Sequence, residues 1–332
     1  MTRMRVLRRG LERAVTVHEG CEARHGFSFG AHYDPDDVFF GALTAHNDER
    51  LAPGAGYPTH RHDEADLVTW VVEGELRHTD SLGNSHILRA GEAQVLAAGT
   101  GVEHAEFAAG AQRCRFVQSW LVPDALASPV LHTVDLRAAL AGGRPVLVGA
   151  GSAPGPFAVT ADPHAAAGAD ALSLQSRAGA RDSAAGADPL SLQRDTGAAD
   201  SAPRADPLSV QRETGARDSA AGADALSVQR GTGARDSAAG ADALSVQRSA
   251  GTPLPLRRAD AALWAARLPA GATWDLPPAR FLHVFVARGS ASLPAGELGE
   301  GDELRLTDEP APTLTSGGAE LLVWAMGSDL RP

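Results

Sequence analysis

The sequence predicts an all-β protein made of two antiparallel β-barrels of the jelly-roll type, with a long disordered repeat insert. Three observations predict this: short apolar runs separated by turn residues up to about residue 124, an 18-residue repeat over 161–251, and a return of strand-like runs over 259–324. The 332 residues, 43% of them hydrophobic, are enough for a core in each of two domains. We therefore expect an N-terminal metal-binding barrel over 1–125, a connection over 126–160, the repeats over 161–251 and a C-terminal metal-free barrel over 252–332.

The N-terminal part shows strands that alternate with tight turns. Residues 67–72 (LVTWVV) are β-branched, aliphatic or aromatic and end at a Glu-Gly pair. Residues 80–85 (DSLGNS) and 90–92 (AGE) supply turn residues between the next apolar runs. Because turns this short join neighbouring strands, we expect antiparallel hairpins.

The middle of the chain is repetitive and poor in apolar residues. The segment 170–175 (DALSLQ) recurs at 188, 206, 224 and 242, and each copy offers only two aliphatic side chains to a core. Ordering costs about 1–2 kcal/mol per residue, which so little apolar area does not offset. We predict a disordered insert, and a folded solenoid or a short transient helix in each copy remains an alternative.

The C-terminal part repeats the strand pattern of the first barrel. Residues 283–289 (HVFVARG) align with 68–74 (VTWVVEG), and 299–302 (GEGD) align with 89–92 (RAGE). Its one histidine, His283, has no second histidine or glutamate two residues away. This indicates a duplicated barrel whose second copy holds no metal.

Composition excludes several classes of protein. A net charge of −11 argues against direct nucleic-acid binding, and no stretch approaches the ~18 apolar residues of a membrane span. The N-terminus does not resemble a signal peptide, and Cys21 and Cys114 cannot form a disulfide framework. We expect a cytoplasmic monomer.

Two histidine-bearing pairs predict a metal site. His60 and His62 lie two residues apart, as do His104 and Glu106, and residues at that spacing point to the same side of a strand. If the two pairs lie on neighbouring strands, all four side chains converge. Three imidazoles and a carboxylate suit a divalent transition metal, Fe(II) first, with Mn, Co, Ni or Cu as alternatives. Up to two open coordination positions would admit a substrate oxygen or O2; an exposed or capping histidine pair is the alternative interpretation.

The N-terminal barrel also resembles a known family over about 100 residues. The matching segments are 25–29 (HGFSF), 32–35 (HYDP), 47–56 (NDERLAPGAG), 60–62 (HRH), 72–75 (VEGE), 78–84 (HTDSLGN) and 98–106 (AGTGVEHAE). They resemble the pirin family of the cupin superfamily, which includes pirin-type quercetin 2,3-dioxygenases. The resemblance implies a bicupin fold, and it places the metal ligands at His60, His62, His104 and Glu106, with Glu106 also catalytic as a proton acceptor. Two departures from the family pattern are Asp66, where glutamate is usual, and Arg61, where proline is common.

The resemblance implies a function and leaves one alternative. It implies a dioxygenase that acts with O2 on a flavonol-like (quercetin-type) or other enolic or phenolic small molecule. The alternative is a non-catalytic metal-binding regulatory protein that acts through protein partners. The other histidines of this barrel, including His78 and His86, are expected to be hydrogen-bonded or exposed rather than ligands.

Overall fold

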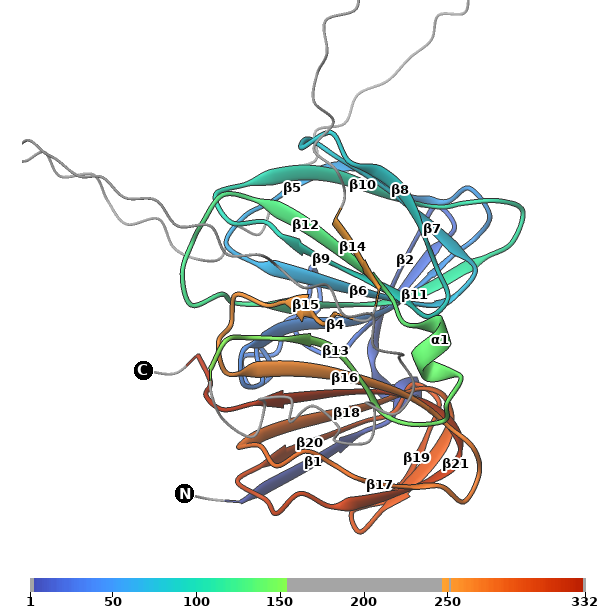
Figure 1. Cartoon of the computed structure of the whole chain (residues 1–332), viewed down its shortest axis with the longest axis vertical. Coiled ribbons are helices and arrows are strands. Elements are labelled where there is room, and N and C mark those ends of the chain that lie inside the picture. The colour runs from blue at the N-terminus through green and yellow to red at the C-terminus, as the bar shows by residue number, and fades with distance from the viewer. Residues whose placement is uncertain (1–2, 154–246, 251, 331–332) are drawn as a thin grey trace, which may run out of the picture. The chain divides into compact units, whose positions relative to one another are not determined.

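The computed structural model describes residues 3–153, 247–250 and 252–330, and it confirms the all-β prediction (Figure 1). The predicted repeat insert lies outside the described residues, apart from 247–250. Helix in the described part is limited to α1 (Arg137–Leu140) and the 3-10 turn Gly10–Glu12, neither of which is long enough to cross a membrane.

Two sheets build the N-terminal half. In the eight-stranded sheet the order is β14-β12-β9-β6-β11-β4-β3-β2, and in the four-stranded sheet it is β5-β10-β7-β8. The eight strands are β2 (Ala14–His18), β3 (Cys21–His25), β4 (Leu43–Leu51), β6 (Asp66–Glu73), β9 (Glu92–Ala97), β11 (Cys114–Leu121), β12 (Val130–Asp135) and β14 (Gln247–Ala250). The four are β5 (Gly56–His62), β7 (Glu75–Asp80), β8 (Ser85–Arg89) and β10 (Val102–Ala108).

A single nine-stranded sheet builds the C-terminal half. Its main path is β1-β20-β18-β21-β16-β13-β15, with β17 paired to β21 and β19 to β18. The strands are β1 (Met4–Arg8), β13 (Val146–Ala150), β15 (Leu254–Pro255), β16 (Ala261–Leu268), β17 (Thr273–Asp275), β18 (Phe281–Leu293), β19 (Gly296–Gly299), β20 (Glu303–Thr307) and β21 (Thr313–Met326). Pairing is antiparallel except between β12 and β14 and between β13 and β15.

The predicted domain bounds do not coincide with the bounds of the sheets. β1 pairs with β20 in the C-terminal sheet, with Met4 opposite Thr307, so the first strand of the chain lies among the orange and red strands of Figure 1. β12, in the predicted connection, pairs with β9 of the N-terminal half. A short apolar run predicts a strand, but the choice of sheet depends on which edge is open in three dimensions.

The two halves share one hydrophobic core. Trp70, Val117 and Leu121 from the N-terminal half pack in the same buried cluster as Phe285 and Trp324 from the C-terminal half. Two indole N–H groups form hydrogen bonds between the halves. Trp70 Nε1 donates to Glu320 Oε1 at 2.9 Å, and Trp324 Nε1 donates to Ser119 Oγ at 3.2 Å. The eight-stranded and nine-stranded sheets therefore stabilise each other through apolar burial and through specific hydrogen bonds.

A buried ionic cluster lies beside this core. The Arg305 guanidinium donates to Glu303 Oε1 at 2.6 Å and to Asp37 Oδ1 at 2.6 Å, while Arg13 Nη2 lies 3.4 Å from Glu303 Oε2. Burial raises the pKa of Glu303, but the two arginines and His283 outweigh burial and hold that pKa well below its usual range. Glu303 is consequently ionised in the folded protein.

Candidate metal centre

The candidate site is carried by two antiparallel strands of the four-stranded sheet. In the register of β5 and β10, His104 lies directly opposite His60. The register shifts before Glu106, which pairs with Tyr57, so β5 carries an extra residue between the two pairs. Such a β-bulge bends a strand and changes the direction of its side chains. The site therefore lies at an irregularity in the ladder.

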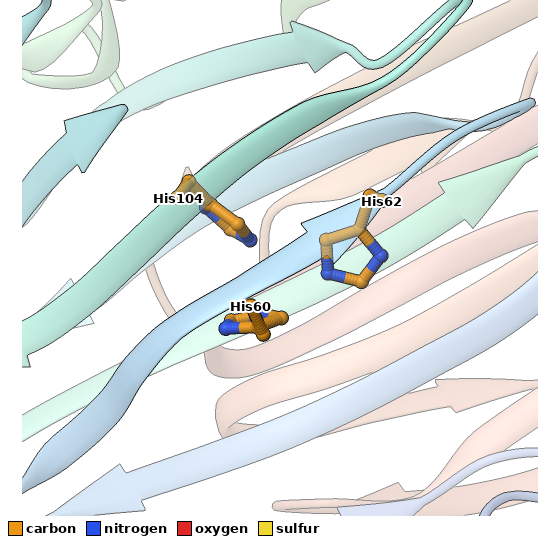
Figure 2. Close-up of side chains that lie close together, drawn as sticks. All are labelled: His60, His62 and His104. Atoms are coloured by element: carbon orange, nitrogen blue, oxygen red, sulfur yellow. The ribbon is translucent and has the colours of Figure 1, made fainter. Parts of the chain in front are cut away.

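Three of the four predicted ligands meet at this point (Figure 2). The ring centroids of His60, His62 and His104 are 4.8, 4.5 and 5.0 Å apart for the pairs 60–62, 60–104 and 62–104. One ring nitrogen of each lies within 4.8 Å of a nitrogen of the other two. We call these residues the histidine trio. The strand spacing of two residues brings the HxH pair to one side, as the sequence predicts.

The ring nitrogens of the histidine trio offer lone pairs that a metal ion can bind. His60 Nδ1 lies 2.8 Å from the Pro58 carbonyl oxygen, so Nδ1 carries the proton and the Nε2 lone pair is available. The buried Nε2 of His62 and both ring nitrogens of His104 have no hydrogen-bond partner among the described residues. A buried polar group left unpaired costs about 1–3 kcal/mol, which a bound cation would offset. The residues fit a metal ion.

The electrostatics of the trio also favour metal binding. Burial, together with the neighbouring imidazoles, lowers the pKa of His62 to about 4 and that of His104 to about 2. Both rings are consequently neutral at pH 7. Neutral imidazole is the form that coordinates a metal, so these two ligands need not lose a proton first.

Glu106 lies beside the trio in a second, overlapping group. This group brings His78, His104 and Glu106 together, again with one ligand atom of each within 4.8 Å of the others. Glu106 is 2% exposed, and its two carboxylate oxygens accept hydrogen bonds from side-chain amides: Gln118 Nε2 at 2.9 Å and Gln94 Nε2 at 3.4 Å. Burial raises the pKa of Glu106, and His78 and Gln118 partly oppose this. The carboxylate is thus next to His104, but it is held from the opposite sheet.

Sequence reasoning missed the polar residues that surround Glu106. His78 was expected to be a hydrogen-bonded histidine; its Nε2 lies 3.0 Å from Asp80 Oδ2, and it also belongs to the second group. Gln94 and Gln118 were not predicted at all. The sequence does contain a signal, because each glutamine lies within a largely apolar run, 92–97 (EAQVLA) for Gln94 and 114–121 (CRFVQSWL) for Gln118.

The two departures from the family pattern have structural roles. Asp66 is buried, and its Oδ2 accepts a hydrogen bond from the backbone N–H of Arg257 at 2.9 Å, which links the two halves of the chain. The Arg61 guanidinium donates to the Thr100 carbonyl oxygen at 3.0 Å. It also lies against Gly101, whose φ is +132°, and a Cβ on that residue would collide with the guanidinium. Arg61 therefore fastens β5 to the turn that precedes β10.

Comparisons with known proteins identify the family of this chain. Residues 8–121 match the family model described as Pirin. A Mycobacterium tuberculosis protein named "Putative quercetin 2,3-dioxygenase" is 31% identical in an alignment of 339 positions that covers 99% of this chain and 98% of the relative. The chain belongs to the pirin family. The family prediction is therefore confirmed for this pirin.

Further relatives support the fold. The Escherichia coli K12 protein named quercetin 2,3-dioxygenase is 38% identical over 119 residues, which are 36% of this pirin and 52% of that protein. A crystal structure of the bacterial pirin YhhW from Escherichia coli in complex with nickel(II) superposes with a TM-score of 0.61 at 20% identity, covering 98% of this chain and 100% of YhhW. At that identity the likeness concerns the two-domain β fold.

Proposed function

We propose that this pirin is a metal-dependent dioxygenase that acts with O2 on a flavonol-like (quercetin-type) or other enolic or phenolic small molecule. The observation that carries the proposal is the convergence of three imidazoles, of which His62 and His104 have buried ring nitrogens with no hydrogen-bond partner among the described residues. Aromatic rings border them: Trp120 contacts His62 edge-on with centroids 4.8 Å apart, and Phe29 contacts Trp120 at 5.3 Å. Both Trp120 and Phe29 are partly exposed, and aromatic faces of this kind favour a planar aromatic substrate.

The donor set favours a divalent transition metal. His60, His62 and His104 supply imidazole nitrogens, and Glu106 would supply the fourth ligand from the second group. We expect Fe(II), with Mn, Co, Ni or Cu as alternatives; nickel(II) is the ion bound by YhhW. The described part of the chain has its two cysteines outside both groups, so the thiolates typical of structural zinc are not involved.

The protein's own residues would bind the substrate and move its proton. When bound, the metal ion supplies Lewis-acid stabilisation of a deprotonated substrate oxygen. Glu106 would accept the hydroxyl proton, and the amide groups of Gln94 and Gln118 hold its carboxylate in place for this step. Trp120 packs on the substrate ring at the partly exposed side of His62 and limits the access of water.

The test measures metal content and turnover separately. Purified protein is loaded with iron and its metal stoichiometry determined, and flavonol absorbance is then followed in air and in an anaerobic control. We expect O2-dependent loss of absorbance that disappears in His62→Ala, whereas His18→Ala, a change at a largely exposed histidine, leaves it intact. Full metal loading with no consumption of flavonols or other enols would favour the non-catalytic regulatory alternative.

Expectations about the setting of the protein accompany this proposal. We expect a cytoplasmic monomer that takes a small-molecule substrate and O2, does not bind nucleic acid directly, and uses a protein partner only under the regulatory alternative. The net charge of −11 supports the expectation about nucleic acid. Gel filtration with light scattering tests the monomer.

A further inference from the structure

The carboxylate of Glu106 is held at both oxygens across the interior of the N-terminal barrel. Glu106 belongs to β10 of the four-stranded sheet, whereas Gln94 and Gln118 belong to β9 and β11 of the eight-stranded sheet. All three are buried, with exposed fractions of 2% for Glu106, 1% for Gln94 and 8% for Gln118. The two glutamines thus connect the sheet that carries the histidine trio to the sheet that faces it.

The direction of the Gln118 amide is fixed by a neighbouring indole. Trp120 Nε1 donates to Gln118 Oε1 at 2.9 Å, and an indole N–H can only donate. The oxygen of this amide therefore faces Trp120, and its NH2 group faces Glu106 Oε2 at 2.9 Å. Gln118 is consequently a donor to the carboxylate in either protonation state of the surrounding histidines.

Two histidines fix the Gln94 amide in the same sense. His78 Nε2 lies 3.0 Å from Asp80 Oδ2, so it carries the proton and leaves Nδ1 as an acceptor for Gln94 Nε2 at 3.3 Å. His86 Nε2 lies 3.0 Å from Gln94 Oε1 and donates to it. The NH2 group of Gln94 therefore faces both His78 and Glu106. Since both nitrogens of His78 are engaged, His78 orients the amide and is not itself a ligand.

We propose that Gln94 and Gln118 form an amide clamp that positions Glu106 as the carboxylate ligand of the metal centre. Each Glu106 oxygen accepts one amide hydrogen bond and keeps a second lone pair, which can be directed towards the ion held by His104. Second-sphere partners of this kind align a ligand before the metal arrives and change its affinity. The inference rests on the proposed metal site, and it names residues that act through Glu106 without touching the ion.

The test compares metal affinity in matched variants. Gln118→Met and Gln94→Met keep the side-chain length and remove the amide, while Gln112→Met makes the same change at an exposed position. We expect the first two to weaken the binding of Fe(II) or Ni(II) by about 10–100-fold in a chelator competition, and Gln112→Met to bind like the wild type. X-ray absorption should show one oxygen donor fewer around the metal in Gln118→Met.

A double-mutant cycle separates positioning from general damage to the barrel. If Gln118 acts through Glu106, adding Gln118→Met to Glu106→Ala weakens binding no further. An undiminished effect in that background, or unchanged affinity in both methionine variants, would overturn the clamp. Should Gln118→Met not fold, as shown by its thermal unfolding, the same cycle is carried out with Gln94→Met.

Metal binding by the wild type and by His62→Ala shows whether this inference or the proposed metal site itself has failed. A wild-type protein that binds no metal, or binds it equally well after His62→Ala, removes the metal site itself. Metal binding that depends on His62 but not on either glutamine would refute only the proposed clamp. Binding of two ions per chain, one of them lost in His78→Ala, would make His78 a ligand and would also contradict the clamp.

Discussion

Replacing His104 by leucine should have opposite effects on the metal-free and the metal-bound protein. The His104 side chain is 1% exposed, and neither ring nitrogen has a partner among the described residues. An unpaired buried polar group costs about 1–3 kcal/mol, and a hydrophobic replacement of similar volume usually costs less than about 1.5 kcal/mol. The difference predicts that metal-free His104→Leu lies between about 0.5 kcal/mol less stable and about 3 kcal/mol more stable than the wild type, with a central expectation of about 1 kcal/mol more stable.

The metal should reverse this order. An ion at 100 times its dissociation constant stabilises the folded state by about 2.7 kcal/mol. In a domain of 150–250 residues each kcal/mol raises Tm by about 2–4 °C, so the wild type should gain roughly 5–11 °C. His104→Leu lacks the ligand that both groups share and should gain little.

Chelator-treated and metal-loaded samples provide the assay. Urea unfolding gives the free energy of the metal-free forms, thermal unfolding gives the metal-dependent shift, and His18→Leu is the exposed control. Destabilisation of metal-free His104→Leu by more than about 1.5 kcal/mol would show that its nitrogens are paired in the native protein. A full metal-dependent shift in the variant would refute His104 as a ligand.

Three further changes test the scaffold. Glu303→Gln should cost about 3–5 kcal/mol at pH 7 because it removes the negative charge that faces the buried guanidinium groups of Arg13 and Arg305. The folded pKa of Glu303 lies below its unfolded value, so the stabilisation that its charge provides is present above about pH 4.5 and is lost as pH falls further. The free energy of unfolding, measured in urea, should therefore fall more steeply from pH 7 to pH 3.5 for the wild type than for Glu303→Gln. Parallel pH curves for the two proteins would contradict this. Asp66→Ala should cost about 1–2 kcal/mol through the hydrogen bond lost from Arg257, with metal affinity unchanged, while the exposed Asp63→Ala should cost less than ~0.5 kcal/mol. Trp324→Ala should cost about 3–5 kcal/mol in chemical unfolding, and a loss below 1 kcal/mol would show that the two halves do not share a core.

The two residue pairs of the site could be predicted because each depends on local geometry, whereas the meeting of His104 with His60 and His62 depends on the pairing of β5 with β10. A strand places residues two apart on one side, so the sequence alone identifies His60 with His62 and His104 with Glu106 as pairs. The bulge between the pairs could not be predicted, since it depends on the register of β5 against β10. The position of Glu106, beside His78 and two glutamines, follows from that register and from the sheet on the other side of the barrel.

The same distinction explains which features of the fold were foreseen. Apolar runs and turns predict strands, and the turn residues predicted at 80–85 join the antiparallel pair β7 and β8. The pairing of β1 with β20 joins residues about 300 positions apart, and no local pattern contains that information. The role of Asp66 is equally non-local, because its partner Arg257 lies beyond the repeats.

The burial of the four predicted ligands follows the order of the strands that carry them. β5 is the edge strand of the four-stranded sheet, and it leaves His60 and His62 partly exposed. β10 lies inside that sheet and buries His104 and Glu106. Side chains on an edge strand can meet an incoming ion or substrate, whereas side chains on β10 are shielded from solvent by the strands on both sides. Under the proposed function, the order of strands in this sheet would place the entry side of the site on β5 and the proton acceptor Glu106 on β10, where the proposed amide clamp of Gln94 and Gln118 would align it.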